Sequence, residues 1–301
     1  MEVINPENES KWLELRTKDI TSTEVSALFG ISPYMTPFEL WHRKKEGVVV
    51  RLDENERMKW GVALQDAIAA QIATEQGWMV RRMNEYIRLP DIRVGASFDF
   101  DIHSVGLLEI KNVDGLVFKN EWTEDENGNI QAPLHIEIQV QHQLLVSGRD
   151  LCYIGALVGG NKQVLIKRTR DEAVIQAIKE KVAEFWARID QNIPPPADFE
   201  ADAEFLGKLF GYAEPGKVLN VVEDKNILHL ASEYQLLKES IKISQGRCDA
   251  IKAELLSKIG DAEKVIGEGF SIDCGITGAS HVEYDREAYR RFMIRFKKVK
   301  P

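Results

Sequence analysis

Hydrophobic residues recur with two different periods along the chain, and each period predicts a different kind of element. Short runs with alternating or continuous apolar positions are typical of strands and occur over 79–89, 93–101, 107–113, 151–158 and 163–168. Three- and four-residue spacing is typical of helices and occurs over 54–76, 133–146 and 170–190. Helices therefore precede, interrupt and follow the strands, which predicts an α/β fold with a mixed central sheet flanked by helices.

A proline-rich stretch, Asn192-Ile-Pro-Pro-Pro-Ala197, interrupts this pattern. Proline fits neither the interior of a helix nor a central strand, so the stretch predicts the end of a domain. We therefore predict a core over residues 1–191, a connection over 192–200 and a C-terminal appendage over 201–301.

The appendage contains one long helical stripe of apolar residues: Ile227, Leu230, Tyr234, Leu237, Ile241, Ile251 and Leu255. The stripe fits a helical hairpin or a coiled-coil arm; most such stripes are buried core seams, and a coil that binds a partner is the alternative. The terminal segment, 284–301, is rich in arginine and lysine. A DNA-contacting tail or a final strand over 292–296 with charged flanks would each explain this composition.

Composition narrows the class of protein. A chain of 301 residues with 44% hydrophobic content is long enough for one large core and an appendage. No apolar stretch reaches membrane-spanning length, and the acidic start lacks the features of a secretion signal. Three widely separated cysteines argue for a reducing cytosol rather than for disulfides or a four-cysteine cluster. These features predict a cytoplasmic protein that does not contact membranes.

The most informative residues are Asp99, Glu109 and Lys111. In the strand Leu107-Leu-Glu-Ile-Lys111 alternate side chains point to opposite faces, so Glu109 and Lys111 share the face turned away from Leu108. A short polar turn ending at Gly106 predicts a hairpin that brings Asp99 beside Glu109. Two carboxylates and an amine would then lie together.

This set fits a magnesium-dependent phosphodiester hydrolase. Mg²⁺ takes oxygen ligands, so Asp99, Glu109 and a backbone carbonyl, that of Ile110, would make an adequate site. Lys111 would orient or deprotonate the attacking water, with its pKa lowered by partial desolvation. An exposed Glu109–Lys111 ion pair without chemical function is the alternative interpretation.

The helix predicted over 133–146 adds neutral amides. Gln139 and Gln143 are four residues apart and so share one helical face, from which an amide can hold a water or a phosphate oxygen. His135 and His142 are seven apart, with no third soft ligand nearby, which argues against a zinc site.

The net charge of −9 is unusual for a protein that binds DNA, although local fields matter more than the total charge. A candidate basic groove, with scattered solvated side chains as the default alternative, comprises Arg16, Lys18, Arg43, Lys44, Lys45, Arg81 and Arg82.

A series of short motifs runs in one order over residues 9–190. They are Trp12-Leu-Glu-Leu-Arg16, Ile20-Thr-Ser-Thr-Glu24, Leu28-Phe-Gly-Ile-Ser-Pro33, Met58-Lys-Trp-Gly61, Ala96-Ser-Phe-Asp99, Leu108-Glu-Ile-Lys111 and Gln139-Val-Gln141. With these motifs the chain resembles the YqaJ-type viral recombinases, the family of lambda exonuclease, in the PD-(D/E)XK nuclease superfamily. The resemblance implies a PD-(D/E)XK nuclease core and covers about two thirds of the chain.

The resemblance also implies roles for individual residues. Asp99 and Glu109 would be metal ligands, Lys111 the catalytic lysine and Gln139 the glutamine that completes the catalytic site. The 5′-phosphate site would comprise Arg16, Thr23 and Ser97, with Arg16 gripping the phosphate; a solvated arginine at a helix end is the alternative. Gln141 is a possible supporting residue.

The chain departs from the family pattern at three positions. Thr23 replaces a serine and keeps its hydroxyl, and Phe98 replaces a proline outside the chemistry. Gln65 replaces a glutamate, so this side chain cannot supply negative charge to a second metal ion.

The resulting hypothesis is a Mg²⁺-dependent 5′-to-3′ exonuclease, with Mn²⁺ as a substitute, acting on double-stranded DNA ends and leaving 3′ single strands for phage-type recombination. Direction, substrate and recombination role come from the resemblance. It also implies a ring-like trimer, a single-strand annealing partner and a bacterial or prophage-encoded origin. An endonuclease of the same superfamily and a DNA-binding or assembly protein with an idle site are the alternatives.

Overall fold

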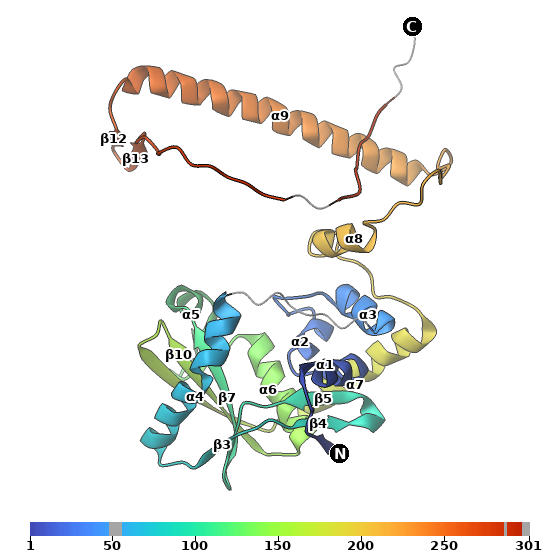
Figure 1. Ribbon diagram of the computed structural model, residues 1–301, viewed down its shortest axis with the longest axis vertical. Helices are drawn as coiled ribbons and strands as arrows, with labels where there is room; N and C mark the ends of the chain where they lie inside the picture. The colour runs from blue at the N-terminus through green and yellow to red at the C-terminus, as the bar shows by residue number, and fades with distance from the viewer. Residues whose placement is uncertain (48–55, 286–287, 297–301) are drawn as a thin grey trace. The chain divides into compact units, whose positions relative to one another are not determined.

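The computed structural model describes residues 1–47, 56–285 and 288–296, and the chain divides into two compact units, Met1–Phe205 and Leu206–Pro301 (Figure 1). Residues 192–205, which include the proline-rich stretch, belong to the first unit. The domain limits predicted from the sequence stay a prediction.

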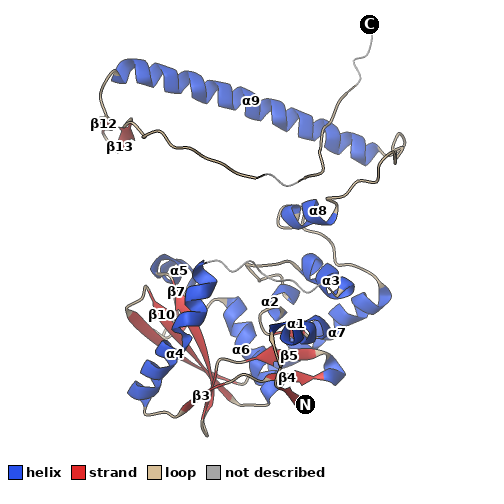
Figure 2. Ribbon diagram, viewed as in Figure 1, coloured by secondary structure: helices blue, strands red, loops and turns tan. Residues whose placement is uncertain are grey.

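A five-stranded mixed sheet forms the centre of the first unit (Figure 2). Its strands in spatial order are β11 (Lys162–Thr169), β10 (Leu151–Val158), β7 (Gly106–Val113), β6 (Phe100–Ile102) and β3 (Val80–Arg82). Strand β7 runs parallel to β10 and antiparallel to β6, so the sheet is mixed as the sequence predicted.

A second, four-stranded sheet lies in the same unit. It comprises β1 (Glu2–Ile4), β4 (Tyr86–Leu89), β5 (Val94–Ser97) and β2 (Ile20–Thr21). The strands expected over 79–89 and 93–101 are therefore each broken in two, with β3 and β6 in one sheet and β4 and β5 in the other. A small hairpin, β8 (Thr123–Glu124) with β9 (Ile130–Gln131), completes the strands of this unit within the described residues.

Helices cover both faces of the five-stranded sheet. Helix α4 (Glu56–Gln76) packs on β7 and β10, where Ile68 and Ile72 form a core cluster with Leu108 and Ile110. Helix α6 (Leu134–Ser147) contacts β10 and β5 and packs against α7 (Glu172–Gln191). The face of β7 turned away from Leu108 is therefore the one available to α6. The first two residues of the helix predicted over 54–76 lie outside the described residues.

The N-terminal helices pack around α6 and α7. They are α1 (Glu9–Lys18), α2 (Val25–Leu28) and α3 (Pro37–Glu46), and α2 contacts both α6 and α7. Helix α3 begins where the Thr36 hydroxyl accepts a hydrogen bond from the Glu39 N–H, with Pro37 at the first helical position. Helix α5 (Gly115–Glu121) follows β7, and a single 3₁₀ turn spans Pro90–Ile92.

The second unit contains the long helix predicted from the apolar stripe, α9 (Lys225–Ile259), and a hairpin of β12 (Lys264–Gly267) and β13 (Phe270–Asp273). Helix α8 (Ala203–Leu209) spans the boundary between the units. The expectation of a buried seam is wrong, because α9 has no buried residue and Ile241 is 63% exposed. The expected strand over 292–296 is also not formed, and the basic residues Lys297, Lys298 and Lys300 lie outside the described residues.

Within the described residues, no helix combines the length and the apolar character that crossing a membrane requires.

Gly106 tests how tightly the first unit is packed at the start of β7. A Cβ at this position would lie 2.3 Å from the Leu151 backbone oxygen, which cannot move without shifting β10. We expect Gly106→Ala to lower the free energy of unfolding by about 1–3 kcal/mol, measured by urea denaturation.

Gly115→Ala is the matched control, since a Cβ there meets nothing within 4 Å. Equal stability of the two variants would contradict the close approach of β7 and β10 at Gly106.

Candidate active site

The two predicted acids lie on neighbouring strands. Phe100 pairs with Leu108 at the end of the antiparallel β6–β7 ladder. Asp99 and Glu109 are the next residues along the chain beyond this pair. The Asp99 Oδ2 accepts a 2.7 Å hydrogen bond from the backbone N–H of Ile110. The tight turn that begins at His103 thus brings Asp99 against the start of the Glu109–Lys111 segment, as predicted.

Glu109 is the most heavily hydrogen-bonded side chain of this cluster. Its Oε1 accepts from the Lys111 Nζ at 2.7 Å and from the Gln139 Nε2 at 2.6 Å, and its Oε2 accepts from the Gln143 Nε2 at 2.7 Å. The Gln139 Oε1 in turn accepts from Lys111 at 3.0 Å. The structure therefore brings Glu109, Lys111 and Gln139 together, and both glutamines reach Glu109 from one face of α6.

The protonation of Lys111 differs from the expectation. Burial alone would lower the pKa of Lys111, but the neighbouring Glu109, with smaller contributions from Asp99 and Tyr34, raises it above the ordinary value. In the metal-free protein Lys111 is therefore a charged hydrogen-bond donor, and the expectation of a lowered pKa is wrong.

The surroundings of Asp99 favour its protonated form. Burial, and then repulsion by Glu109, raise the pKa of Asp99 to about 7, although the Ile110 N–H and the charge of Lys111 favour the ionised form. Its other oxygen accepts from the Gln65 Nε2 at 3.0 Å. Two partly desolvated carboxylates that repel each other form an arrangement that a cation would stabilise.

The donor atoms available to a cation are oxygens. No group of three or more His, Cys, Asp or Glu side chains suited to a metal exists among the described residues, so the two carboxylates need other oxygen ligands. The N–H and C=O of one strand residue point to the same side, and the Ile110 N–H points to Asp99, so its carbonyl is directed there as well. Asp99, Glu109 and the Ile110 carbonyl thus fit a hard cation such as Mg²⁺.

The predicted 5′-phosphate residues form a second cluster. Arg16 donates to the Thr23 hydroxyl at 3.2 Å and to the Thr21 hydroxyl at 3.4 Å, and its guanidinium lies 4.6 Å from the centre of the Trp12 ring. The Trp12 Nε1 donates to the Ser97 Oγ at 2.8 Å. Arg16, Thr23 and Ser97 are therefore neighbours, connected by Trp12.

A buried lysine holds the backbone beneath Arg16. The Lys44 Nζ donates to the carbonyls of Arg16 and Asp19 at 2.6 and 2.7 Å and to a Glu24 carboxylate oxygen at 2.8 Å. Lys44 therefore does not belong to a solvent-facing DNA groove, and that assignment is wrong. This role was not predictable from the sequence, because Lys44 stands between two other basic residues.

Gln143 joins the two clusters. Besides Glu109 it contacts the Ser97 backbone oxygen at 3.4 Å, while the Ser97 hydroxyl is held by Trp12. The helical spacing of Gln139 and Gln143 was the signal that located this residue.

Gln141 lies outside the candidate site. Its Nε2 donates to the Thr169 carbonyl at 2.8 Å, and its Oε1 accepts from the Asp171 N–H at 2.9 Å, at the start of α7. Its expected supporting role is therefore structural, since residues two apart on a helix face different directions.

The expected basic groove is partly neutralised by ion pairs. Arg82 donates to Asp66 at 2.6 Å and to the Gln65 Oε1 at 3.1 Å, and Arg81 pairs with Glu85 at 2.8 Å. Gln65 therefore links Arg82 to Asp99 and does lie at the candidate site.

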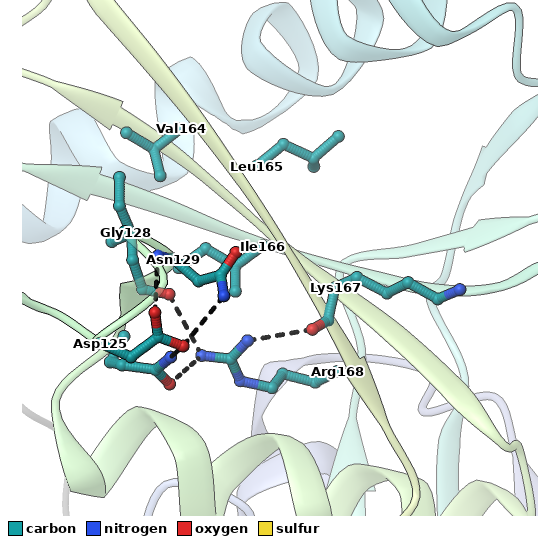
Figure 3. Close-up of a pocket in the computed structure, with 10 residues that line it drawn as sticks. Asp125, Gly128, Asn129, Val164, Leu165, Ile166, Lys167 and Arg168 are labelled. Atoms are coloured by element: carbon teal, nitrogen blue, oxygen red, sulfur yellow. Dashed lines mark hydrogen bonds between the residues drawn. The ribbon is translucent and has the colours of Figure 1, made fainter.

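A separate cavity of about 530 Å³ lies between the β8–β9 hairpin and β11 (Figure 3). Several of its polar side chains are paired: Asp125 accepts from Asn129, and Arg168 donates to Gln131 and Glu137. None of the predicted catalytic residues lines this cavity.

Comparisons with known proteins identify relatives of the chain. Residues 11–150, which contain all the residues assigned above from the resemblance, match the YqaJ-like viral recombinase domain. The uncharacterized protein YqaJ of Bacillus subtilis (strain 168) is 29% identical over 259 residues, which are 84% of this chain and 79% of the relative.

Two solved structures are also similar. The alkaline exonuclease LHK-Exo from Laribacter hongkongensis has a TM-score of 0.48 and 21% identity, covering 66% of this chain and 99% of the exonuclease. A phage-related exonuclease from Haemophilus somnus 129PT has a TM-score of 0.43 and 12% identity, covering 58% of this chain and 95% of that protein.

The raised pKa of Asp99 predicts a dependence of stability on pH. The folded protein retains a proton on Asp99 between about pH 4 and pH 7 that the unfolded chain releases, so stability contributed by this group is lost as the pH rises through that window. We expect Asp99→Asn to raise the free energy of unfolding by about 2 kcal/mol at pH 8 and by almost nothing at pH 4, measured by urea denaturation in EDTA.

Asp101→Asn is the control, because Asp101 pairs with Arg149 at 2.6 Å and its loss should bring no gain at pH 8. An Asp99→Asn protein no more stable than wild type at pH 8 would show that burial and Glu109 do not raise the pKa of Asp99.

Proposed function

We propose that this chain, whose residues 11–150 match the YqaJ-like viral recombinase domain, is a metal-dependent deoxyribonuclease that degrades double-stranded DNA from 5′ ends. The observation that carries the proposal is the cluster of Asp99, Glu109, Lys111 and Gln139, with three of these side chains joined by hydrogen bonds of 3.0 Å or less. Degradation from 5′ ends would leave 3′ single strands, which is the product expected of a viral recombinase.

Asp99, Glu109 and the Ile110 carbonyl would hold Mg²⁺, which Mn²⁺ could replace. The bound ion would act as a Lewis acid on the scissile phosphate and lower the pKa of a coordinated water. Its charge would also relieve the repulsion that raises the pKa of Asp99.

Lys111 and Gln139 would position the water and the phosphate. Lys111 is a charged donor here, which suits contact with a phosphate oxygen or with the attacking water better than proton abstraction. The Gln139 amide is fixed at both ends, by Lys111 and Glu109, so it presents a defined geometry without added charge.

Arg16 would bind the terminal 5′-phosphate. A guanidinium matches a phosphate with two parallel hydrogen bonds, and the hydroxyls of Thr21 and Thr23 already fix its orientation. Because Gln143 connects Ser97 to Glu109, a phosphate held near Arg16 would have a defined position relative to the acids. This anchor favours an exonuclease over an endonuclease.

A cleavage assay tests the proposed activity. Wild type with Mg²⁺ and linear duplex should release mononucleotides from a 5′-labelled end before a 3′-labelled end, and should leave closed circular duplex intact. Lys111→Ala should reduce kcat by about a hundredfold or more, because it removes the charged donor next to Glu109 and Gln139.

Lys167→Ala, at an exposed position on β11, is the control and should retain activity. Cleavage of circles would indicate the endonuclease. DNA binding without any cleavage in Mg²⁺ or Mn²⁺ would indicate a protein with an idle site.

A comparison of DNA ends tests the anchor. Wild type should degrade 5′-phosphorylated duplex at least about tenfold faster than 5′-hydroxyl duplex, the size expected for a charged hydrogen bond. Arg16→Ala should abolish this preference mainly by slowing the phosphorylated substrate.

Lys18 lies on the same helix as Arg16 but pairs with Glu14 and not with the Thr23 hydroxyl. Lys18→Ala therefore removes a charge from this helix and should keep the preference for 5′-phosphorylated duplex. Equal wild-type rates on the two ends would refute the anchor without touching the nuclease assignment.

A further inference from the structure

One face of α6 extends beyond the residues used above. His135, Gln139 and Gln143 are spaced by four residues and therefore share a face. Gln143 bonds Glu109, and Gln139 bonds both Glu109 and Lys111, so successive turns of α6 follow β7 from Glu109 toward Lys111. His135, one turn further, comes next to the Lys111 end of the cluster.

The electrostatic surroundings of His135 agree with this placement. Burial lowers the pKa of His135, and the second contribution comes from the positive charge of Lys111. This contribution agrees with the position of His135 one turn before Gln139 on α6.

A tyrosine lies against His135. Tyr34 lies in the loop between α2 and α3, and its ring meets the His135 ring edge-on, with centroids 6.0 Å apart. Its backbone N–H donates to the Ser32 hydroxyl at 3.2 Å, which fixes the loop at this point.

Tyr34 nevertheless contributes little to the core, since it is 74% exposed. The half-buried imidazole of His135 lies perpendicular to the Tyr34 ring, and most of the Tyr34 side chain stays open to solvent. An exposed aromatic ring against His135, one helical turn from Gln139 and its partner Lys111, has the composition of a site for a nucleobase whose phosphate reaches the charged groups. Bases of every kind have a π-face, so such a contact does not depend on sequence.

We propose that Tyr34 and His135 form a nucleobase-stacking site that positions the nucleotide attached to the scissile phosphate. This inference rests on the proposed nuclease function and adds to it the part of the substrate that the two rings recognise. Tyr34 provides the stacking face, and His135 holds that face in place; neither is assigned a role in proton transfer.

Equilibrium binding separates this proposal from catalysis. The probe is a 5′-phosphorylated duplex carrying a fluorophore at its far end, titrated with protein in EDTA and followed by anisotropy. Tyr34→Ala should raise Kd about tenfold, within the range measured for loss of a base–aromatic stack, whereas Tyr34→Phe should stay within about twofold of wild type. Tyr212→Ala is the matched control, since Tyr212 is 77% exposed and belongs to the C-terminal unit.

A duplex with abasic residues at the 5′-terminal positions completes the cycle. Wild type should bind it about tenfold more weakly than the intact duplex, and Tyr34→Ala should bind both equally. If Tyr34→Ala weakens both duplexes by the same factor, or neither, the stacking site is refuted. A wild type that does not bind the probe refutes it as well.

Cleavage is scored separately, with Lys111→Ala as the reference variant. If wild type binds the intact duplex more tightly than the abasic duplex as expected but does not cleave DNA, the nuclease function is overturned and the stacking site stands. Normal cleavage in wild type with no base-dependent effect of Tyr34→Ala would do the reverse.

Discussion

The candidate active site of the first unit depends on the hydrogen bonds made by the buried Glu109 carboxylate. Its two oxygens accept from three side chains, Lys111, Gln139 and Gln143, and these connect the central strand β7 to α6. A buried carboxylate with fewer donors would be costly, since desolvation penalises the charged form. The same bonds that make the charge tolerable therefore fix the position of every neighbouring polar group.

Glu109 also acts on Asp99, because its negative charge adds to burial in raising the pKa of that acid. The Ile110 N–H and the Gln65 amide stabilise Asp99 without adding net charge. The cluster therefore keeps an electrostatic deficit that a bound divalent ion would remove.

Local alternation was sufficient to predict β7, the hairpin to Asp99 and the glutamine face of α6, because each depends on residues close in sequence. It failed where the chain changes sheets. The apolar pattern continues through Met83 and Phe98, yet the chain leaves one sheet for the other at these points, and only tertiary packing determines that. The burial of Lys44 was equally invisible, since its three acceptors lie 20 or more residues away.

Gln65 shows how a departure from a family pattern acquires a physical meaning. A glutamate here would place a third negative charge beside Asp99, whose pKa is already raised by burial and by Glu109. The Gln65 amide instead donates to Asp99 and accepts from Arg82. It therefore orients the Asp99 carboxylate and links it to the positively charged Arg82. Because the amide brings no charge, Gln65 acts on the orientation of the Asp99 carboxylate and does not add to the negative charge around it.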